Sequence, residues 1–385
     1  MREVAVVGCG MTRFGRSERS LVDLLVEASL KAISDAGACE RDFDAVYVGN
    51  MCSGEFNMVT GVAAALADRV GLIPSAADRV ENGPASGGSA VKAGFLAVAS
   101  GLYDMVLVAG GEKMTSTPTG RVADVIATLT HPEREYKYGA TLPSFGGLLM
   151  RMYMERYGVK RESISLVAVK NHKNGALNPY AHFQKEVTLE EVLRSPVIAD
   201  PLRLYDTCPI SDGAAAVVLC PANAAKEFTD TPVLVKGVGQ ATDVQSVAER
   251  EDPTVLNALR VAAGKAYAMA GVTPRDVDVA ELHDAFTILE IVESEDAGLF
   301  EKGKGAKAVE EGETWIGGRI PVNPSGGLKA RGHPLGATGV AQIVELTWQL
   351  RGEAGRRQVD GAETGLAVNF GGFGNSIVVH VLQRR

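Results

Sequence analysis

The spacing of hydrophobic and polar positions predicts strands and helices that follow one another in a regular order. In the first part of the chain, apolar runs predict strands at 3–7, 45–51 and 105–111, and helical spacing predicts helices at 20–36 and 60–72. The run at 105–111 is apolar throughout, which is typical of a strand in a sheet buried on both faces. Further along, residues 163–174 are expected to form a helix, and residues 205–219 a turn that leads into a buried strand.

The second part of the chain repeats this order. The pattern predicts strands at 233–238, 277–282, 365–369 and 377–382, a helix at 253–269 and a further helix after residue 282. The polar stretch 221–231 is the expected join, so we predict an N-terminal half at residues 1–225 and a C-terminal half at 226–385. A repeated strand–helix order indicates a duplicated α/β unit, with two sheets sandwiched by helices and two helices buried between them.

The regular pattern breaks between residues 115 and 157, where prolines, scattered charges and aromatic residues predict an inserted loop domain at about 115–160. Long insertions of this kind are often functional lids. Apolar side chains of this segment are candidates for accepting a bulky or aromatic group: Phe145, Leu148, Leu149, Met150, Met152 and Met154. The same spacing also fits the plain core of a helix.

Small residues crowd the stretch from Val80 to Ser100, with glycine, alanine or serine at almost every position from 83 to 90. Such a run allows a buried helix N-terminus, whose free N–H groups and partial positive charge suit a nucleophile or an oxyanion. The helix is expected to begin at Pro84, because proline is favoured at the first helical position. Pro84 offers neither a nucleophilic side chain nor a backbone N–H.

Composition restricts the classes of function. The chain has 385 residues with a formal net charge of −8, which argues against nucleic-acid and anionic membrane partners. Its five cysteines are scattered and form no CxxC pair, so reduced thiols and a cytoplasmic location are expected, and no metal site is readable. No apolar run reaches the length of a membrane span, and no P-loop motif is present.

Two histidines stand in settings that suit chemistry. His283 lies in Glu-Leu-His-Asp-Ala-Phe, where it is expected to end a buried strand and open a helix, and His333 lies in a loop rich in glycine and proline. Two imidazoles near each other can donate hydrogen bonds to an oxyanion that develops during a reaction. Backbone N–H groups of Gly371 and Gly372 are further candidates for holding an oxyanion.

Three motifs together resemble the thiolase superfamily, in particular its archaeal and sterol-carrier-protein-2 branch. They are Val-Glu-x-x-x-Ala-Ser-Gly-Gly at 80–88, His-Asp-Ala-Phe at 283–286, and Asn-Pro-Ser-Gly-Gly followed by Gly-His-Pro-Leu-Gly-Ala-Thr-Gly at 323–339. The resemblance implies a five-layer αβαβα fold of two duplicated halves with a lid insertion over the substrate. It also implies that His283 and His333 hold the thioester oxygen of an enolate.

The sequence departs from the family at the positions of its two cysteines. In the family, the residue at position 84 is the cysteine that accepts the acyl group and whose N–H contributes to an oxyanion hole; here it is Pro84. The second cysteine of the family corresponds to Asn369, or in the sterol-carrier branch to Ala285. Cys52, Cys208, Tyr205 and Asp284 are candidates for the missing base, and the spacing selects none of them.

The resemblance also implies partners. We expect an acyl-CoA as substrate with no tightly bound cofactor, a homodimer, and CoA phosphates held by lid residues such as Arg121, Lys137 and Arg151. Some thiolase-like aldolases work with a small zinc-ribbon/OB-fold subunit, which is a further candidate partner.

Three functions follow as hypotheses. The first is an enzyme that makes or breaks a C–C bond alpha to a CoA thioester through an enolate, as in retro-aldol cleavage, which needs no acyl nucleophile. The second is an acyl-CoA acyltransferase that uses another nucleophile or direct attack by CoA. The third is a non-catalytic thiolase-like subunit of a complex, against which the intact His283/His333 pair argues.

Overall fold

The computed structural model describes residues 1–385, apart from the side chain of residue 40. Within these residues, nine strands form one mixed sheet in the order β3-β2-β4-β7-β1-β8-β11-β10-β9. The strands are β1 (Val4–Met11), β2 (Ala45–Gly49), β3 (Ala76–Val80), β4 (Val106–Glu112), β7 (Gly213–Pro221), β8 (Val233–Thr242), β9 (Val279–Glu281), β10 (Thr364–Gly371) and β11 (Ser376–Arg384). A separate small hairpin pairs β5 (Val197–Ala199) with β6 (Leu202–Arg203).

The helices are α1 (Leu21–Asp35), α2 (Ser53–Asn57), α3 (Val62–Val70), α4 (Ser86–Ser100), α5 (Thr119–Ala127), α6 (Leu142–Tyr157), α7 (Arg161–Gly175), α8 (Leu189–Arg194), α9 (Asn257–Ala270), α10 (Thr287–Asp296), α11 (Gly305–Glu310), α12 (Gly327–Ala330) and α13 (Leu335–Arg351). None of those in the described part of the chain combines the length and the apolar character that a membrane crossing requires.

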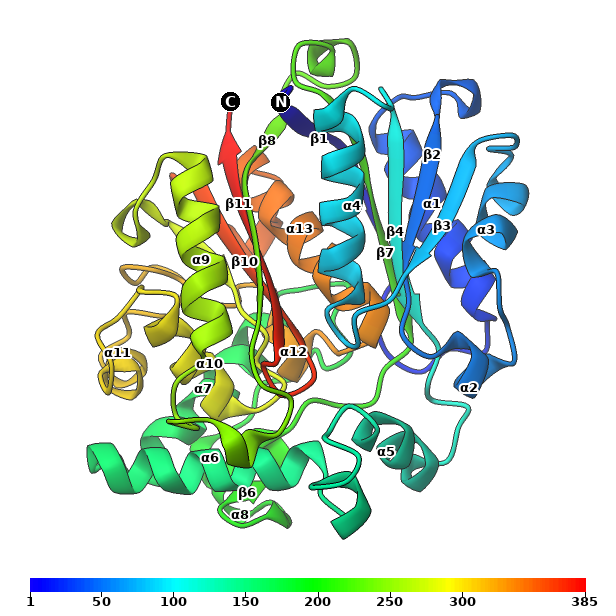
Figure 1. Ribbon diagram of the computed structural model, residues 1–385. Coiled ribbons are helices and arrows are strands. Elements are labelled where there is room, and N and C mark those ends of the chain that lie inside the picture. The colour runs from blue at the N-terminus through cyan, green and yellow to red at the C-terminus, as the bar shows by residue number, and fades with distance from the viewer.

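The elements stack in five layers, as Figure 1 shows. Helices α1 and α3 cover the strands β3, β2, β4, β7 and β1 from outside, and α9 covers β8 and β11 on the opposite side of the molecule. Between these two halves of the sheet lie α4 and α13, which pack against each other. The five-layer α/β architecture expected from the sequence is confirmed.

The two halves share the same order and direction of strands. In the first half β2 and β4 are parallel, whereas β4 and β7, and β7 and β1, are antiparallel. In the second half β9 and β10 are parallel, whereas β10 and β11, and β11 and β8, are antiparallel. The predicted boundary between residues 225 and 226 falls in the short connection from β7 to β8, at the turn Ala225–Glu227.

The expectation of two separate sheets was wrong. Residues 4–6 of β1 pair antiparallel with residues 233–235 of β8, so that the two halves join into one continuous sheet. Strand β1 is buried along its whole length, and its outward backbone groups need hydrogen-bond partners. The start of β8 supplies them.

Two helix starts also differ from the prediction. Helix α4 begins at Ser86 rather than at Pro84, because residues 82–85 form a turn closed by a hydrogen bond from Ala85 N to Asn82 O of 3.0 Å. Helix α9 begins at Asn257 rather than at residue 253, because the side chain of Asp252 accepts the N–H of Thr254 at 2.9 Å and holds a turn there.

The segment predicted as a loop domain is largely helical. Two of its prolines stand at helix starts: Pro118 is the N-cap of α5, and Pro143 lies in the first turn of α6 behind the capping residue Thr141. In Figure 1, α5 and α6 lie side by side beneath the two halves of the sheet. The insertion therefore forms a helical cover at the end of the molecule where α4 and α13 begin.

Helices α4 and α13 approach each other through glycine. A Cβ atom on Gly339 would lie 2.1 Å from the backbone N of Gly88, and one on Gly87 would lie 2.6 Å from the backbone O of Gly336. Real Cβ atoms do not come this close to backbone, so the two helices contact each other main chain to main chain. The run of small residues in the sequence serves this contact.

We predict that Gly339→Ala lowers the free energy of unfolding by at least about 2 kcal/mol, because its methyl group overpacks a backbone contact. The matched control is Gly264→Ala on α9, where a Cβ meets nothing within 4 Å. That variant should raise stability by about 0.5–1 kcal/mol through helix propensity. Urea unfolding followed by circular dichroism measures both changes, and equal stabilities of the two variants would contradict the contact.

Candidate active site

The starts of α4 and α13 and the ends of β9 and β10 meet at one point, where a cavity of about 330 Å³ opens. Among the residues that line it are Pro84, His283, His333, Phe370 and Gly372. Four segments far apart in the sequence thus bring together the positions that the motifs singled out.

Pro84 lies in the turn in front of α4. The turn is held by Ser86, whose hydroxyl donates to Gly83 O at 2.5 Å and accepts from Asn82 N at 2.9 Å. Gly83 has φ +54°, which favours glycine at this position. The ring of Pro84 lines the cavity, where a cysteine at this position would present its thiol.

Asn369 connects Pro84 to His283. Its Oδ1 accepts the N–H of Gly88 at 3.0 Å, and this bond fixes which end of the amide is the oxygen. Its Nδ2 donates to the carbonyl of Pro84 at 3.3 Å and to Nδ1 of His283 at 3.1 Å. The amide is thus held on three sides in a single orientation.

His283 lies between β9 and α10 rather than at the first residue of a helix, which corrects the sequence expectation. Its backbone N–H donates to the carboxylate of Glu293 on α10 at 2.7 Å, and its ring stacks on Phe370 with centroids 5.5 Å apart. Because Nδ1 accepts from Asn369, the network assigns the ring proton to Nε2. His283 therefore presents an N–H donor at its remaining nitrogen.

His333 carries its proton on the other ring nitrogen. Its Nδ1 lies 2.7 Å from the hydroxyl of Thr338, and that hydroxyl donates its own proton to Pro334 O at 3.0 Å. The hydroxyl can then only accept from His333, so Nδ1 carries the proton and Nε2 has a free lone pair. The ring centroids of His283 and His333 lie 4.8 Å apart at 86°, so a donor and an acceptor stand side by side.

Both imidazoles are held neutral. Burial first, and the nearby guanidinium of Arg331 second, lower the pKa of His333 to about 3. Burial lowers the pKa of His283 well below its ordinary value, with the same sign from His333 and Arg331. In the neutral pair, His283 offers an N–H donor and His333 a nitrogen lone pair, whose basicity the lowered pKa reduces.

Gly371 and Gly372 lie against the turn that contains Pro84. A Cβ atom on Gly83 would be 3.5 Å from the backbone N of Gly372, and one on Gly371 would be 2.7 Å from Asn82 O. Gly372 has φ +61° and lines the cavity. The position of Gly372 at the cavity is compatible with donation of a backbone N–H to an oxyanion. That role stays a prediction.

The lid residues considered for CoA phosphates lie outside the cavity lining. Arg121 pairs with Asp124 at 2.8 Å, Lys137 lies 3.7 Å from Glu133, and Arg151 pairs with Asp200. All three cations are exposed. They are on the cover formed by α5 and α6, and the structure does not bring them to the histidine pair.

The four candidate bases differ in position. Cys208 lines the cavity, whereas Tyr205 packs edge-on against His172 and Cys52 lies in a small core cluster that includes residues of α5. Asp284 accepts the N–H of Leu328 at 2.7 Å and caps α12. Burial raises the pKa of Cys208 to about 12, so its thiol keeps its proton at neutral pH.

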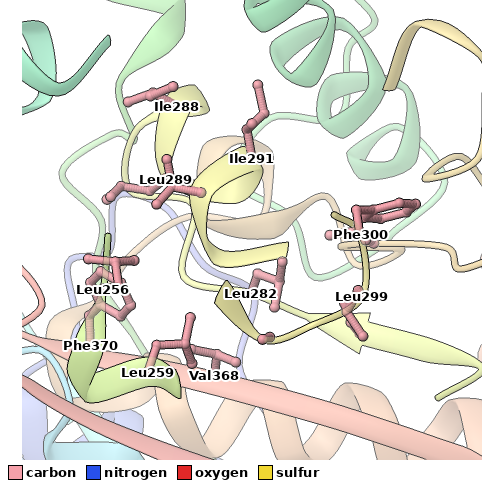
Figure 2. Packing of buried hydrophobic residues seen from close by; sticks show 14 of the residues in the cluster. Leu256, Leu259, Leu282, Ile288, Leu289, Ile291, Leu299, Phe300, Val368 and Phe370 are labelled. Carbon is pink, nitrogen blue, oxygen red and sulfur yellow. The ribbon is translucent and has the colours of Figure 1, made fainter. Parts of the chain in front are cut away.

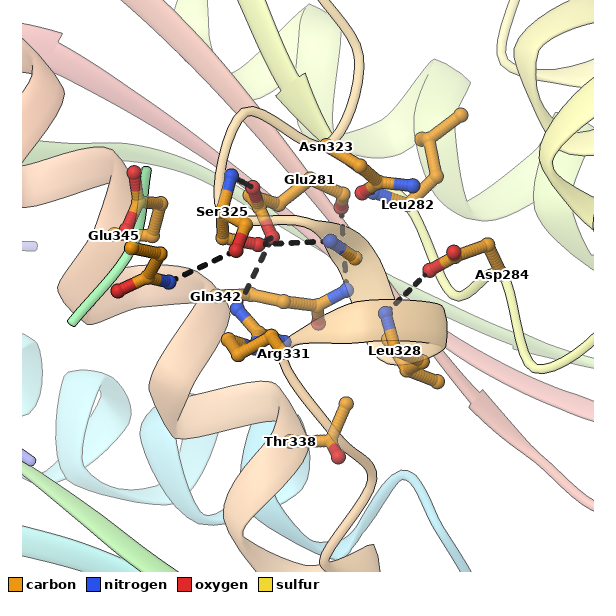
Figure 3. A network of polar contacts seen from close by, with 12 residues as sticks. Glu281, Leu282, Asp284, Asn323, Ser325, Leu328, Arg331, Thr338, Gln342 and Glu345 are labelled. Atoms are coloured by element: carbon orange, nitrogen blue, oxygen red, sulfur yellow. Dashed lines mark hydrogen bonds and ion pairs between the residues drawn. The ribbon is translucent and has the colours of Figure 1, made fainter. Parts of the chain in front are cut away.

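A buried polar network behind the histidines was not found from the sequence (Figure 3). Glu281 accepts from Arg331 at 3.1 Å and from the hydroxyl of Ser325 at 2.7 Å, and Asp284 holds α12. These contacts tie the segment carrying His283 to the loop carrying His333. The sequence did contain a signal for this network, because Glu281 is a charged residue inside an otherwise apolar run. Thr338, which contacts His333, belongs to the Gly-His-Pro motif.

Within the described part of the chain, no group of three or more His, Cys, Asp or Glu side chains is arranged to hold a metal ion.

Comparisons with known proteins match both halves of the chain. The family model "Thiolase, N-terminal domain" matches residues 4–223, and "Thiolase C-terminal domain-like" matches residues 239–384. An "Acetyl-CoA acetyltransferase" of Methanothermobacter thermautotrophicus is 50% identical over 385 residues, which is 100% of each chain. "Sterol carrier protein 2" of Homo sapiens is 36% identical over 98% of this chain and 71% of that protein.

Solved structures of similar fold support this relationship. One described as "Ltp2-ChsH2(DUF35) aldolase" superposes with a TM-score of 0.87 at 27% identity, covering 99% of this chain and 97% of that chain. "Crystal structure of human mitochondrial 3-ketoacyl-CoA thiolase" has a TM-score of 0.76 at 19% identity over 99% of this chain and 98% of that chain, and it supports the fold alone.

We predict that His333 stays neutral down to about pH 4, because its pKa is lowered to about 3. An unfolded chain binds this proton near pH 6.5, so the folded state loses stability as the pH falls from about 6.5 toward 3. NMR of ¹⁵N-histidine-labelled protein measures the titration, with His333→Gln to assign the signal. A titration midpoint near 6.5 would contradict the buried neutral pair.

Proposed function

The chain belongs to the thiolase superfamily, and on that premise we propose that it makes or breaks a C–C bond alpha to a coenzyme A thioester without an acyl-enzyme at position 84. The family indicated by the sequence motifs is confirmed by matches over both halves of the chain. The chain is thiolase-like in fold and related to enzymes named acetyl-CoA acetyltransferases. The reaction route proposed here goes beyond that relationship.

The observation that carries the proposal is a pair of histidines next to Pro84. His283 presents an N–H donor and His333 presents an acceptor nitrogen. Covalent acyl transfer needs a nucleophile, and Pro84 supplies none at the position where the family has one. Cleavage of a β-hydroxyacyl-CoA needs a base for the β-hydroxyl and a donor for the enolate oxygen. His333 and His283 offer these two groups, 4.8 Å apart between ring centroids.

The proposed step balances without another reactant. Nε2 of His333 takes the proton of the β-hydroxyl, and the Cα–Cβ bond breaks to release a ketone or an aldehyde. The bonding electron pair moves into the thioester as an enolate, whose oxygen accepts a hydrogen bond from Nε2–H of His283. His333 then returns the proton to Cα, which gives the shortened acyl-CoA. The reverse sequence is an aldol addition.

Asn369 is the proposed positioning residue for His283. Since its Nδ2 donates to Nδ1 of His283 at 3.1 Å, it keeps the ring proton on Nε2, where the enolate oxygen needs it. This role replaces the acid–base thiol that the family carries at the same place. Gly371 and Gly372 are proposed to donate backbone N–H groups to the same substrate.

Coenzyme A is the proposed carrier of the substrate, without a tightly bound cofactor. Arg121, Lys137 and Arg151 remain proposed contacts for its phosphates. These three cations form exposed ion pairs with carboxylates, and an exposed ion pair stabilises a fold by only about 0–1 kcal/mol. Replacing the carboxylate by a CoA phosphate would therefore cost little free energy.

Two protein partners are proposed. A homodimer would cover β3, the strand at one edge of the sheet, whose side chains are mostly exposed in the single chain. A small subunit is proposed because the structural relative at TM-score 0.87 is described as an Ltp2-ChsH2(DUF35) aldolase. Co-purification of a small protein with the natural chain would support the second partner.

Acyl transfer through Cys208 is the second candidate function. This thiol lines the cavity, and the backbone N of Cys208 donates to Ala285 O at 2.9 Å, next to the position of a family cysteine. The raised pKa of Cys208, about 12, makes it a weak nucleophile at neutral pH, which favours the lyase route.

Product analysis tests the proposal. The purified protein, with and without a co-purifying small subunit, is given a β-hydroxyacyl-CoA alone, and separately a β-ketoacyl-CoA with free CoA. We expect release of a ketone or aldehyde without free CoA. CoA-dependent formation of two acyl-CoAs would overturn the lyase assignment, and thiolysis gained only in Pro84→Cys would indicate a binding subunit.

We predict that Asn369→Asp lowers kcat by about two to three orders of magnitude with a smaller change in KM. A carboxylate at this position accepts from Nδ1–H of His283, which moves the ring proton away from Nε2 and removes the donor to the enolate. The ¹⁵N chemical shifts of His283 report the tautomer directly, apart from activity. Unchanged shifts together with unchanged kcat would refute the positioning role.

We predict that His333→Gln lowers kcat by about two to four orders of magnitude, because the amide offers no base for the β-hydroxyl. Retained thermal stability is the control for folding. A variant that keeps most of its kcat would show that another group takes the proton, and Cys208→Ala in the same background would then identify whether the thiol does so.

A further inference from the structure

A second cavity, of about 440 Å³, opens beside α1, the helix that covers the first half of the sheet from outside. It is lined by the loop between β1 and α1, by the first two turns of α1 and by His182. The loop residues are Thr12, Arg13, Phe14, Gly15, Arg16, Ser17 and Arg19, and those of α1 are Leu24 and Glu27. The described residues that line this cavity and the one at Pro84 do not overlap, so the two cavities are separate.

The charged side chains at this second cavity are mostly cationic, although the whole chain has a formal net charge of −8. Three of them are the arginines Arg13, Arg16 and Arg19, and one is the carboxylate of Glu27. That carboxylate is shared between two cations, since it pairs with Lys31 at 2.7 Å and also with Arg19. Positive charge therefore exceeds negative charge at this place on the surface.

Two of the arginines are available to a ligand. Within the described part of the chain, Arg13 has no carboxylate oxygen within 4.0 Å, and Arg16 reaches only Glu18, at 4.0 Å, where both side chains are mostly exposed. An exposed pair at this distance contributes little to stability, so Arg16 can exchange it for a bound anion. Guanidinium groups bind phosphate and carboxylate oxygens through paired N–H donors.

The loop that carries these arginines is held from beneath by a buried ion pair. Asp212 accepts the backbone N–H of Ser17 at 3.0 Å and pairs with Lys113 at 2.9 Å. Lys113 also donates to Ser17 O at 2.7 Å, and the N–H of Gly15 donates to Asp212 O at 3.1 Å. The backbone of the loop is therefore fixed before a ligand arrives, which lowers the entropy cost of binding.

His182 adds an imidazole to the same space. Its Nδ1 lies 2.9 Å from the hydroxyl of Ser211, so Nε2 is the ring nitrogen left for a ligand. Burial first, and the charge of Arg13 second, lower the pKa of His182, so this guanidinium acts directly on the ring. An anion beside both groups would be attracted by the guanidinium and would stabilise the protonated imidazole.

The loop that carries His333 lies between the two cavities. The N–H of His182 donates to Arg331 O at 2.9 Å, and the hydroxyl of Ser211 accepts the N–H of His333 at 3.3 Å. Because the same hydroxyl contacts Nδ1 of His182, Ser211 joins the second cavity to the backbone of His333. A ligand in the second cavity would therefore lie directly behind this imidazole.

His283 is fixed in a different way, by packing rather than by polar contacts to this cavity. Its neighbour Leu282 and the ring of Phe370, on which it stacks, belong to the buried apolar cluster of the second half, part of which Figure 2 shows. We therefore expect a ligand in the second cavity to affect His333 more than His283.

We propose that the second cavity binds a phosphate group, held by the guanidinium groups of Arg13 and Arg16 and by the ring of His182. A phosphate suits these three groups better than a single carboxylate does, because it offers more negative charge and more acceptor oxygens. The volume of about 440 Å³ leaves room for a molecule that carries the phosphate. This site is separate from the cavity of the proposed reaction, and binding to it does not depend on that reaction.

The test uses protein labelled with ¹⁵N-histidine, in which His182 reports the new site and His333 reports the loop behind it. Sodium phosphate is added at constant ionic strength in place of chloride, and sodium citrate serves as a polyanion without phosphate. We expect phosphate to shift the signals of His182 strongly, those of His333 weakly and those of the buried His380 not at all. The variant His182→Gln assigns the signal of the new site.

Arg13→Gln combined with Arg16→Gln is the variant for the site, because both side chains are exposed and their replacement leaves the core intact. Phosphate binding should weaken at least about tenfold in this double variant, since charge-assisted hydrogen bonds are lost. Arg275→Gln combined with Arg384→Gln removes the same charge from exposed positions that line neither cavity, and should bind phosphate like the wild type. Thermal unfolding confirms that both double variants are folded.

Equal phosphate affinities of the two double variants, or equal shifts of all histidine signals, would overturn the site. Citrate binding as tight as that of phosphate would overturn phosphate as the ligand. Adenosine 3′,5′-bisphosphate then distinguishes the source of the phosphate: tighter binding than that of inorganic phosphate indicates a nucleotide, and weaker binding indicates free phosphate or a small ester, and both results support the site. These readouts need no turnover, so the site and the lyase function stand or fall separately.

Discussion

The close approach of α4 and α13 is the constraint on which the rest of the structure depends. Both helices begin at the cavity, and their glycines allow main-chain contact that any Cβ would prevent, such as the 2.1 Å that a methyl on Gly339 would have from Gly88 N. Only because the helices lie this close can Asn369 reach Gly88, Pro84 and His283 together. The same close packing buries the two imidazoles, and burial is the main cause of their lowered pKa values.

Because the contact region of α4 and α13 is buried, its polar groups need hydrogen-bond partners inside the protein. The carboxylate of Glu112, at the end of β4, accepts four N–H bonds of 2.9–3.0 Å from Asn50, Met51, Cys52 and Gly336. Burial raises the pKa of Glu112 to about 7, while the backbone donors act in the opposite direction. The carboxylate thereby fastens the start of α13 to the first half of the sheet, as Glu281 and Asp284 fasten the histidine loops in the second half.

Local patterns predicted much of the fold, whereas features that depend on distant partners were not readable. Apolar runs placed the main strands and the motifs brought Pro84, His283, His333 and Asn369 to one point, as their shared contacts show. The pairing of β1 with β8 was missed because it joins residues more than two hundred positions apart. Pro118 and Pro143 were read as breakers because a proline at a helix start looks locally the same as one in a loop. The tautomers of the two histidines depend on Thr338 and Asn369, so they required the fold.

Pro84 and Asn369 fit one another under the proposed lyase route. In covalent acyl transfer the acyl group stays bound to the enzyme after the Cα–Cβ bond breaks, whereas direct cleavage releases both fragments without a covalent stage. A residue at position 84 then no longer has to attack, and its carbonyl instead accepts the Asn369 amide at 3.3 Å, which helps to orient the donor nitrogen of His283. The loss of both family cysteines is therefore consistent with a single change of chemistry, from an acyl-enzyme to a pair of positioned imidazoles.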